Sequence, residues 1–135
     1  MVPFFSVYSD FALLVGRVIL GVILVAHGWP KVKNFKGTAG WMESIGLKPG
    51  TLFAGVSVLL EFVGGLMLIF GLFTQCIAAL VVLQFVIIIA KVNFKKGLVG
   101  GYELDLAILA LAAVLWAVGG GEKSLDALFQ LRIFW

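Results

Sequence analysis

The stretch LFAGVSVLLEFVGGLMLIF (residues 52–70) is long and apolar enough to cross a membrane as a helix. About 20 apolar residues span the hydrocarbon core of a bilayer, and this stretch has a single ionisable side chain, Glu61, at its middle. An ionisable side chain at that depth costs about 2.5–3.5 kcal/mol on insertion scales, so it usually faces the interior of a helix bundle and has a partner or a task. The stretch therefore predicts a transmembrane helix and makes Glu61 the first candidate functional residue.

Three other apolar runs of similar length lie at residues 11–29, 72–92 and 102–118. We expect the first run to end before Pro30, because proline cannot continue a helix interior. The loops between the runs are too short to hold an extramembrane domain. The sequence thus predicts an all-α polytopic membrane protein in which residues 1–135 form a single domain, a four-transmembrane-helix bundle.

The composition excludes other classes of protein. Of the 135 residues, 62% are hydrophobic and only 13% are charged, whereas soluble domains have about 25% charged residues. The net charge of +3 does not indicate nucleic-acid binding, because most basic residues lie in loops between the apolar runs. Lysines at such places report membrane orientation and contact anionic headgroups. We therefore expect membrane lipid, and no nucleic acid, as a partner.

The distribution of basic residues also predicts how the chain crosses the membrane. Lysines gather in or beside the first and third loops, whereas the N-terminal segment and the second loop have neither lysine nor arginine. Because basic residues are enriched in cytoplasmic loops, we expect loops one and three in the cytoplasm and both termini outside. The lysines concerned are Lys31, Lys33, Lys36, Lys48, Lys91, Lys95 and Lys96.

Two shorter segments, residues 38–47 and 124–134, are expected to lie on the membrane surface. The first has an apolar side at helical spacing that includes Met42. The second begins with Ser124 as a helix N-cap and has Asp126 in an acidic first turn. Its apolar side chains would then lie in the plane of the headgroups.

Arg17 and Glu61 are expected to form a buried ion pair. Antiparallel neighbouring helices would bring the two to a similar depth, within reach of the arginine side chain. Ser57, Gly64 and Gly65 share the Glu61 face at helical spacing, and Gly21 and Gly28 share the Arg17 face. Small residues on such faces let membrane helices approach closely. The pair either fixes the register of the helices or lines a cavity for an acidic or carbonyl-bearing ligand.

A second polar group is predicted nearer the cytoplasmic face. It comprises His27 and Lys31 at the end of the first run, and Tyr102, Glu103 and Asp105 at the start of the fourth. Histidine, tyrosine and carboxylates in apolar surroundings can deliver protons to a reduced quinone or to a transported substrate. The alternative is interfacial snorkelling with hydrogen bonds to backbone and headgroups, which we favour for Lys31 and Tyr102.

Gln84 in the third run is predicted to form an interhelical hydrogen bond, a contact worth about 1 kcal/mol in membranes. Cys76 is the single cysteine, so the chain has no intrachain disulfide and no CxxC redox pair. The sequence has no pattern of haem or metal ligands and no glycine-rich phosphate loop. We therefore expect neither a metal nor an intrinsic cofactor.

Five short motifs follow one another along residues 14–128: Arg17-x3-Gly21 with His27-Gly28-x2-Lys31, Glu61-x2-Gly64-Gly65, Gly71-Leu72-Phe73-Thr74, Gly100-Gly101-Tyr102-Glu103, and Gly119-x-Gly121-x2-Ser124-Leu125-Asp126. In order and spacing they resemble the DoxX family of small four-span bacterial membrane proteins. The resemblance implies a four-helix fold in the bacterial cytoplasmic membrane. It marks Arg17, His27, Lys31, Glu61 and Glu103 as family-typical positions. The family is named for similarity to a subunit of a thiosulfate:quinone oxidoreductase, and some relatives are tied to oxidative-stress and thiol-redox complexes.

The residues and the resemblance together favour a membrane subunit of a redox system that binds a quinone or small apolar ligand in the bundle. Arg17 and Glu61 would shape the pocket, and His27 and Glu103 would connect it to cytoplasmic protons. A partner oxidoreductase, soluble or membrane-bound, is then expected. Two other classes stay open. One is a small-solute transporter or channel built as a homo-oligomer, and the other is a membrane scaffold that recruits a soluble oxidoreductase through its basic first loop and tail.

Overall fold

A computed structural model of the chain describes residues 3–121 and 124–128, and these residues form helices and short connecting turns. The elements are α1 (Pro3–Lys33), α2 (Phe35–Ser44), α3 (Gly50–Val58), the π-helical turn η1 (Leu59–Val63), α4 (Gly64–Phe70), α5 (Thr74–Ile88), η2 (Ile89–Asn93), η3 (Phe94–Lys96), η4 (Leu98–Tyr102), α6 (Glu103–Val118) and α7 (Leu125–Leu128).

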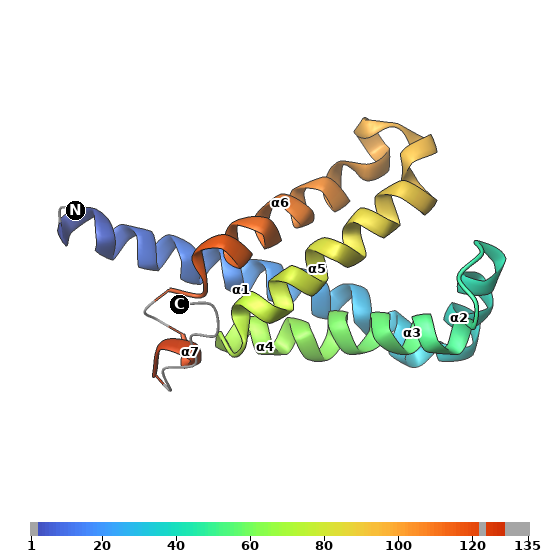
Figure 1. Cartoon of the computed structure of the whole chain (residues 1–135), viewed down its shortest axis with the longest axis horizontal. Helices are drawn as coiled ribbons and strands as arrows, with labels where there is room; N and C mark the ends of the chain where they lie inside the picture. Colours follow the sequence, from blue (N-terminus) through green and yellow to red (C-terminus); the bar gives the residue numbers. More distant parts are fainter. Residues whose placement is uncertain (1–2, 122–123, 129–135) are drawn as a thin grey trace.

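Four helical stretches are long and apolar enough to cross a membrane, with mean hydropathies between 1.9 and 2.4. They are Tyr8–Lys33, Gly50–Phe70, Thr74–Lys96 and Leu98–Val118. The second stretch comprises α3, η1 and α4, which follow one another in a single line (Figure 1). The prediction of an all-α, four-span membrane protein is confirmed.

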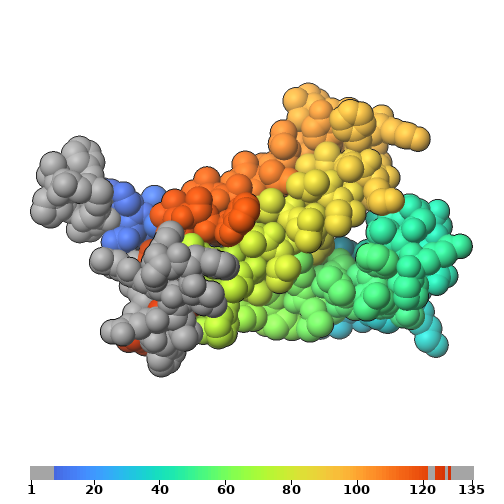
Figure 2. All heavy atoms as spheres, in the orientation of Figure 1, coloured from blue at the N-terminus to red at the C-terminus, as the bar shows by residue number. Residues whose placement is uncertain are grey.

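The spans form two antiparallel pairs, α1 with α3–α4 and α5 with α6 (Figure 1). The start of α1 and the short helix α7 lie at one end of the molecule, which we call the α7 end. Helix α2 and the loop between α5 and α6 lie at the opposite, lysine-rich end. The two pairs diverge toward the lysine-rich end, and Figure 2 shows the surface notched there between the α5–α6 loop and α2. Loops one and three therefore lie at the same end of the protein, as predicted.

Helix α1 continues through Pro30 to Lys33, so the prediction that it ends before Pro30 is wrong. A proline removes one backbone hydrogen bond from a helix, and other contacts hold the turn that follows. The backbone N–H of Asn34 donates to the carbonyl of Pro30 at 3.0 Å. The side chain of Lys31 forms an ion pair with Glu61 on the neighbouring span. These contacts extend α1 by one turn.

Apolar side chains from all four spans form the main core. Its buried members are Leu20, Leu24, Leu60, Leu68, Ala78, Val81, Phe85, Ile108, Ala112 and Leu115. A smaller cluster of Ala39, Met42 and Ala54 packs α2 against α3. Met42 is only 7% exposed, so the apolar side of the predicted surface segment 38–47 faces the protein at this position. Trp41 beside it is exposed.

The turn between α4 and α5 depends on Gly71, which has a φ of +74°. This left-handed conformation favours glycine and commonly ends helices. The N–H groups of Gly71 and Leu72 donate to the carbonyls of Leu68 and Met67, at 3.1 and 2.8 Å. A Cβ on Gly71 would also lie only 2.7 Å from Nη1 of Arg17. The glycine therefore both reverses the chain and leaves room for the arginine.

Candidate functional site

Glu61 lies in the π-helical turn η1, halfway along the second span, and is 1% exposed. Single π-helical turns within α-helices are rare and occur frequently at functional sites. Three side chains from three spans surround its carboxylate: Lys31 on α1, Ser57 on α3 and Gln84 on α5. We call these four residues the polar centre. It joins both helix pairs in the interior of the bundle.

The hydrogen bonds that Glu61 accepts within the polar centre all go to one of its two carboxylate oxygens. Its Oε1 accepts from Lys31 Nζ at 2.7 Å, from Gln84 Nε2 at 2.5 Å and from Ser57 Oγ at 3.3 Å. The hydroxyl of Ser57 in turn accepts from Lys31 Nζ at 2.9 Å and from Gln84 Nε2 at 3.4 Å. The predicted interhelical hydrogen bond of Gln84 is thereby confirmed.

Two buried oxygens of the polar centre have no hydrogen-bond donor among the residues that the structure describes. They are Oε2 of Glu61 and Oε1 of Gln84. Buried polar atoms are nearly always hydrogen-bonded, because an unmet acceptor costs about 1–3 kcal/mol. The charges of the centre therefore balance through the Lys31–Glu61 ion pair, whereas two of its acceptor oxygens have no donor in the described part of the chain.

Small residues bring α1 close enough to the second span for Lys31 to reach Glu61. A Cβ on Gly28 would lie 2.9 Å from the backbone nitrogen of Phe62 and 3.1 Å from Cβ of Glu61. A Cβ on Gly21 would lie 2.6 Å from the carbonyl oxygen of Gly65. Larger side chains at these positions would force the helices apart, which confirms the predicted close packing along these faces.

Arg17 does not pair with Glu61, so the predicted ion pair is wrong. Its guanidinium is buried, as expected, but lies against Gly71 at the end of α4. Nη1 of Arg17 donates to the carbonyl of Gly120 at 2.7 Å. Gly71 is ten residues after Glu61, which corresponds to about 15 Å along a helix. Arg17 therefore holds the turn after α6 at the α7 end, while Lys31 is the cation that meets Glu61.

Of the predicted surface segment 124–134, the structure describes residues 124–128, and these dock on the bundle through Asp126; residues 129–134 lie outside the described residues. Asp126 is 9% exposed, and its two carboxylate oxygens accept from the N–H groups of Phe73 and Thr74 at 2.6 and 2.8 Å. Asp126 thus caps α5 and not its own helix. The sequence offered one indication of this contact. Phe73, the residue before α5, has no polar side chain to cap that helix, so the cap had to come from elsewhere in the chain.

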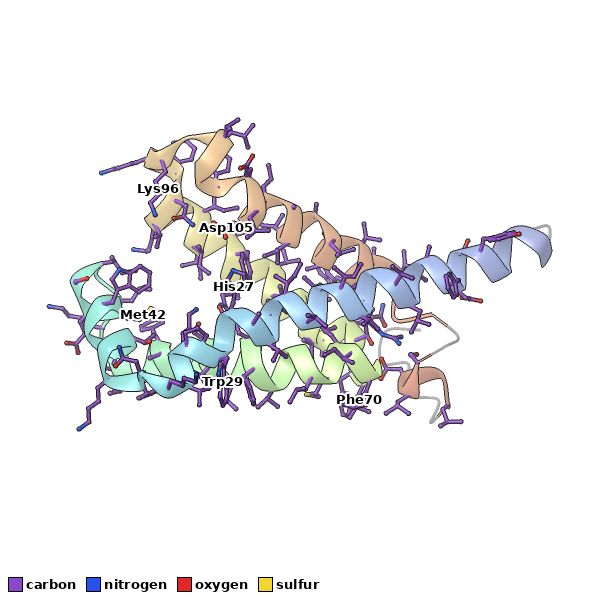
Figure 3. The ribbon with its side chains drawn as sticks, turned by 180° about the vertical axis from the view of Figure 1, so that it is seen from behind. His27, Trp29, Met42, Phe70, Lys96 and Asp105 are labelled. Atoms are coloured by element: carbon purple, nitrogen blue, oxygen red, sulfur yellow. The ribbon has the colours of Figure 1, made fainter. Side chains whose placement is uncertain are left out.

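His27 and Lys31 lie one turn apart on α1 and were predicted to belong to one polar group near the cytoplasmic face. The structure places their side chains in different surroundings. Lys31 enters the polar centre, so the expectation that it only snorkels is wrong. His27 is exposed, and its Nδ1 lies 2.8 Å from the carbonyl oxygen of Ile23 on its own helix. In Figure 3 His27 projects from α1 on the side of the α5–α6 hairpin, and Trp29 projects on the opposite side.

The acidic residues at the start of α6 have local partners and are not part of the polar centre. Glu103 is exposed and accepts a hydrogen bond from a backbone N–H of the preceding loop at 3.0 Å. Asp105 accepts a hydrogen bond from the side chain of Asn93. The ring of Tyr102 stacks on that of Phe94, with centroids 6.0 Å apart. These contacts organise the tip of the hairpin, where it diverges from α1 (Figure 1).

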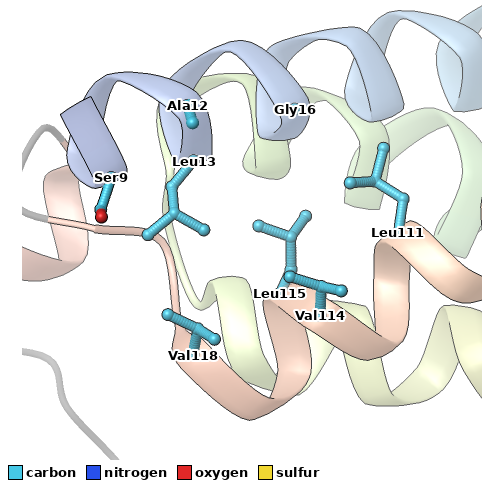
Figure 4. Close-up of a pocket in the computed structure, with 8 residues that line it drawn as sticks. All are labelled: Ser9, Ala12, Leu13, Gly16, Leu111, Val114, Leu115 and Val118. Atoms are coloured by element: carbon cyan, nitrogen blue, oxygen red, sulfur yellow. The ribbon is translucent and has the colours of Figure 1, made fainter. Parts of the chain in front are cut away.

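A groove of about 280 Å³ lies between the first half of α1 and α6, toward the α7 end (Figure 4). Its lining has no ionisable side chain and consists of Ser9, Ala12, Leu13, Gly16, Leu111, Val114, Leu115 and Val118. Along α1, Gly16 is twelve residues from Gly28, which packs against Glu61. That separation is about 18 Å. The groove is therefore distinct from the polar centre.

The chain is similar to known membrane proteins over most of its length. The DoxX family model matches residues 12–94, which include all four residues of the polar centre. "Putative oxidoreductase CatD" of Bacillus subtilis is 32% identical over 117 residues, or 87% of this chain and 86% of that protein. "Inner membrane protein YqjF" of Escherichia coli is 32% identical over 128 residues, or 92% of this chain and 96% of that protein.

A shorter match, "Inner membrane protein YphA" of Escherichia coli, is 32% identical over 79 residues, or 54% of this chain and 56% of that protein. No solved structure matches the chain. The inner membrane relatives and the four apolar helices identify a multi-pass protein of the bacterial inner membrane. With a family model that matches more than half of the chain and relatives that match nearly all of it, the chain belongs to the DoxX family.

Proposed function

We propose that this chain is the membrane subunit of a redox system and that its polar centre binds a quinone-type ligand inside the bundle. The observation that carries the proposal is the buried Lys31–Glu61 ion pair with donor-free oxygens on Glu61 and Gln84. An ion pair that served only to fix helix register would need no open hydrogen-bonding positions. Unmet acceptors in a membrane interior instead fit a site that a ligand completes.

The surroundings of the polar centre suit a ligand that arrives from the lipid phase. Binding sites for small molecules are mostly apolar, with a few convergent polar groups that fix orientation. Here the polar groups converge on one carboxylate, and the main apolar core adjoins it through Leu60 and Phe85. The side chain of Lys31 is 24% exposed, so the centre lies only one side chain from the protein surface. A quinone ring, apolar with two polar oxygens, matches this combination.

A partner oxidoreductase, soluble or membrane-bound, would exchange electrons with the ligand, because the sequence has no motif for a redox cofactor of its own. The printed name of one relative, "Putative oxidoreductase CatD", supports a redox role. The lysines of loops one and three support a cytoplasmic location for the lysine-rich end. The partner would then approach from the cytoplasm or within the membrane.

Quinone retention tests the proposal. Protein purified in a mild detergent from bacterial membranes is extracted with organic solvent, and co-purified quinone is measured by mass spectrometry. We expect near-stoichiometric quinone in the natural protein and its loss in the double variant Lys31→Met/Glu61→Leu. That variant replaces the ion pair by apolar side chains of similar size, a change that buried ion pairs often tolerate.

Glu43→Gln is the matched control, because Glu43 is exposed on α2 and its side chain accepts a hydrogen bond from the backbone N–H of Gly50, away from the polar centre. It should retain quinone like the natural protein. Equal quinone in the double variant, or none in the natural protein even after incubation with added quinone, would refute the proposal.

A further inference from the structure

The polar centre has two buried acceptor oxygens without a hydrogen-bond donor among the residues described. A ligand with a hydroxyl group can donate to them, whereas a ligand with only carbonyl oxygens cannot. We infer that the centre selects the reduced, hydroxyl-bearing form, the quinol, over the oxidised form, the quinone. The inference rests on the function proposed above and specifies which form of the ligand the site is built to hold.

Every donor atom of the centre already has an acceptor within it. Nε2 of Gln84 donates to Oε1 of Glu61 at 2.5 Å and lies 3.4 Å from Oγ of Ser57. The hydroxyl of Ser57 donates to Glu61. The ammonium of Lys31 has three N–H groups, of which two reach Ser57 and Glu61. The third N–H of Lys31 is left to meet a ligand.

The open acceptors are Oε2 of Glu61 and Oε1 of Gln84, both buried. The direction of the Gln84 amide follows from charge. Its NH2 group faces the ionised carboxylate oxygen at 2.5 Å, and the reverse orientation would set two oxygens against each other without a proton between them. The amide oxygen of Gln84 must therefore point away from Oε1 of Glu61 and is available to a donor.

A quinol hydroxyl fits these positions and a quinone carbonyl does not. The hydroxyl donates its proton to the Glu61 or Gln84 oxygen and can also accept from the remaining N–H of Lys31. A carbonyl oxygen only accepts, so it leaves both buried acceptors unmet and brings its own partial negative charge toward the Glu61 carboxylate. A hydrogen bond to a charged group is worth enough to predict about a tenfold or larger preference for the quinol.

The test compares the two redox forms of one soluble probe, duroquinol and duroquinone, on the natural protein in detergent micelles. Dissociation constants are measured by anaerobic titration calorimetry. We expect duroquinol to bind at least ten times more tightly. Equal dissociation constants, or tighter binding of duroquinone, would overturn this inference and leave the proposed function intact. Absence of binding by both forms would overturn the proposed function as well.

The variant E61Q should move the binding preference from duroquinol toward duroquinone, a result that a merely structural role of Glu61 would not produce. In E61Q the new amide oxygen keeps the three donors that Oε1 has now, so its NH2 group takes the place of Oε2. An acceptor becomes a donor, and the preference should shift toward duroquinone. In Q84L the ion pair stays and one acceptor is lost, so the preference for duroquinol should fall without reversing. E43Q, the same substitution on exposed α2, should keep the natural preference; an unchanged preference in both E61Q and Q84L would contradict the inference.

Discussion

Replacing Lys31 by methionine removes the cation from the buried carboxylate of Glu61 and leaves the side-chain length almost unchanged. Breaking a buried ion pair by removing one partner typically costs about 3–5 kcal/mol, because the remaining charge is uncompensated. Glu61 still accepts hydrogen bonds from Gln84 and Ser57 in this variant. These two donors offset part of the cost, so we expect the free energy of unfolding to fall by about 3 kcal/mol, the lower end of that range.

The assay is equilibrium unfolding in detergent micelles, followed by tryptophan fluorescence, on Lys31→Met, Glu61→Gln and the double variant Lys31→Met/Glu61→Gln. The double variant has no unpaired charge, so it should lose clearly less stability than the two single variants together. The exposed Lys95→Met serves as control and should stay within about 0.5 kcal/mol of the natural protein. If the losses of stability in the two single variants sum to within about 0.5 kcal/mol of the loss in the double variant, the two residues do not form one energetic unit, and the reasoning is refuted.

Three other predictions concern packing, capping and orientation. Gly21→Ala should destabilise the protein by about 1–3 kcal/mol in the same assay, because its Cβ would lie 2.6 Å from backbone oxygen. Gly55→Ala, where nothing lies within 4 Å, should be neutral or stabilising, and equal effects would contradict the packing argument. Asp126→Ala should cost about 1–2 kcal/mol and speed hydrogen exchange of the two amides it caps; unchanged exchange would refute the cap. Lys95→Cys in a Cys76→Ala background should react with a membrane-impermeant thiol reagent only after the cytoplasmic side is exposed, and labelling of intact spheroplasts would reverse the proposed orientation.

Hydropathy and spacing were sufficient for the architecture because they depend on local sequence alone. The run around Glu61 is apolar at nearly every position, and any such run must form a helix in lipid to satisfy its backbone groups. The placement of loops one and three at one end follows from the even number of spans between them. The small residues Gly21 and Gly28 on one span and Gly65 on the next also predicted a contact between the two helices, because small residues are enriched where membrane helices pack closely.

The end of α1 and the docking of the C-terminal segment could not be predicted in the same way. Pro30 is a helix breaker by itself, and one of the contacts that hold the turn after it, the ion pair of Lys31 with Glu61, comes from another span. Asp126 looks like the first turn of its own helix, yet it caps α5, more than fifty residues earlier in the chain. Both outcomes depend on partners that are distant in sequence.

The sequence by itself determined that a carboxylate would lie deep in the membrane and need a cation, because a lone charge there is too costly. Only the tertiary structure decided which cation it is. Gly28 packs at the level of Glu61, and eleven residues earlier on α1 Arg17 reaches Gly71, ten residues beyond Glu61 on the neighbouring span. This axial offset between two antiparallel helices comes from how their small residues interlock. Lys31 lies fourteen residues after Arg17, so a shift of about 21 Å along the helix leaves hydropathy unchanged while it exchanges one cation for the other.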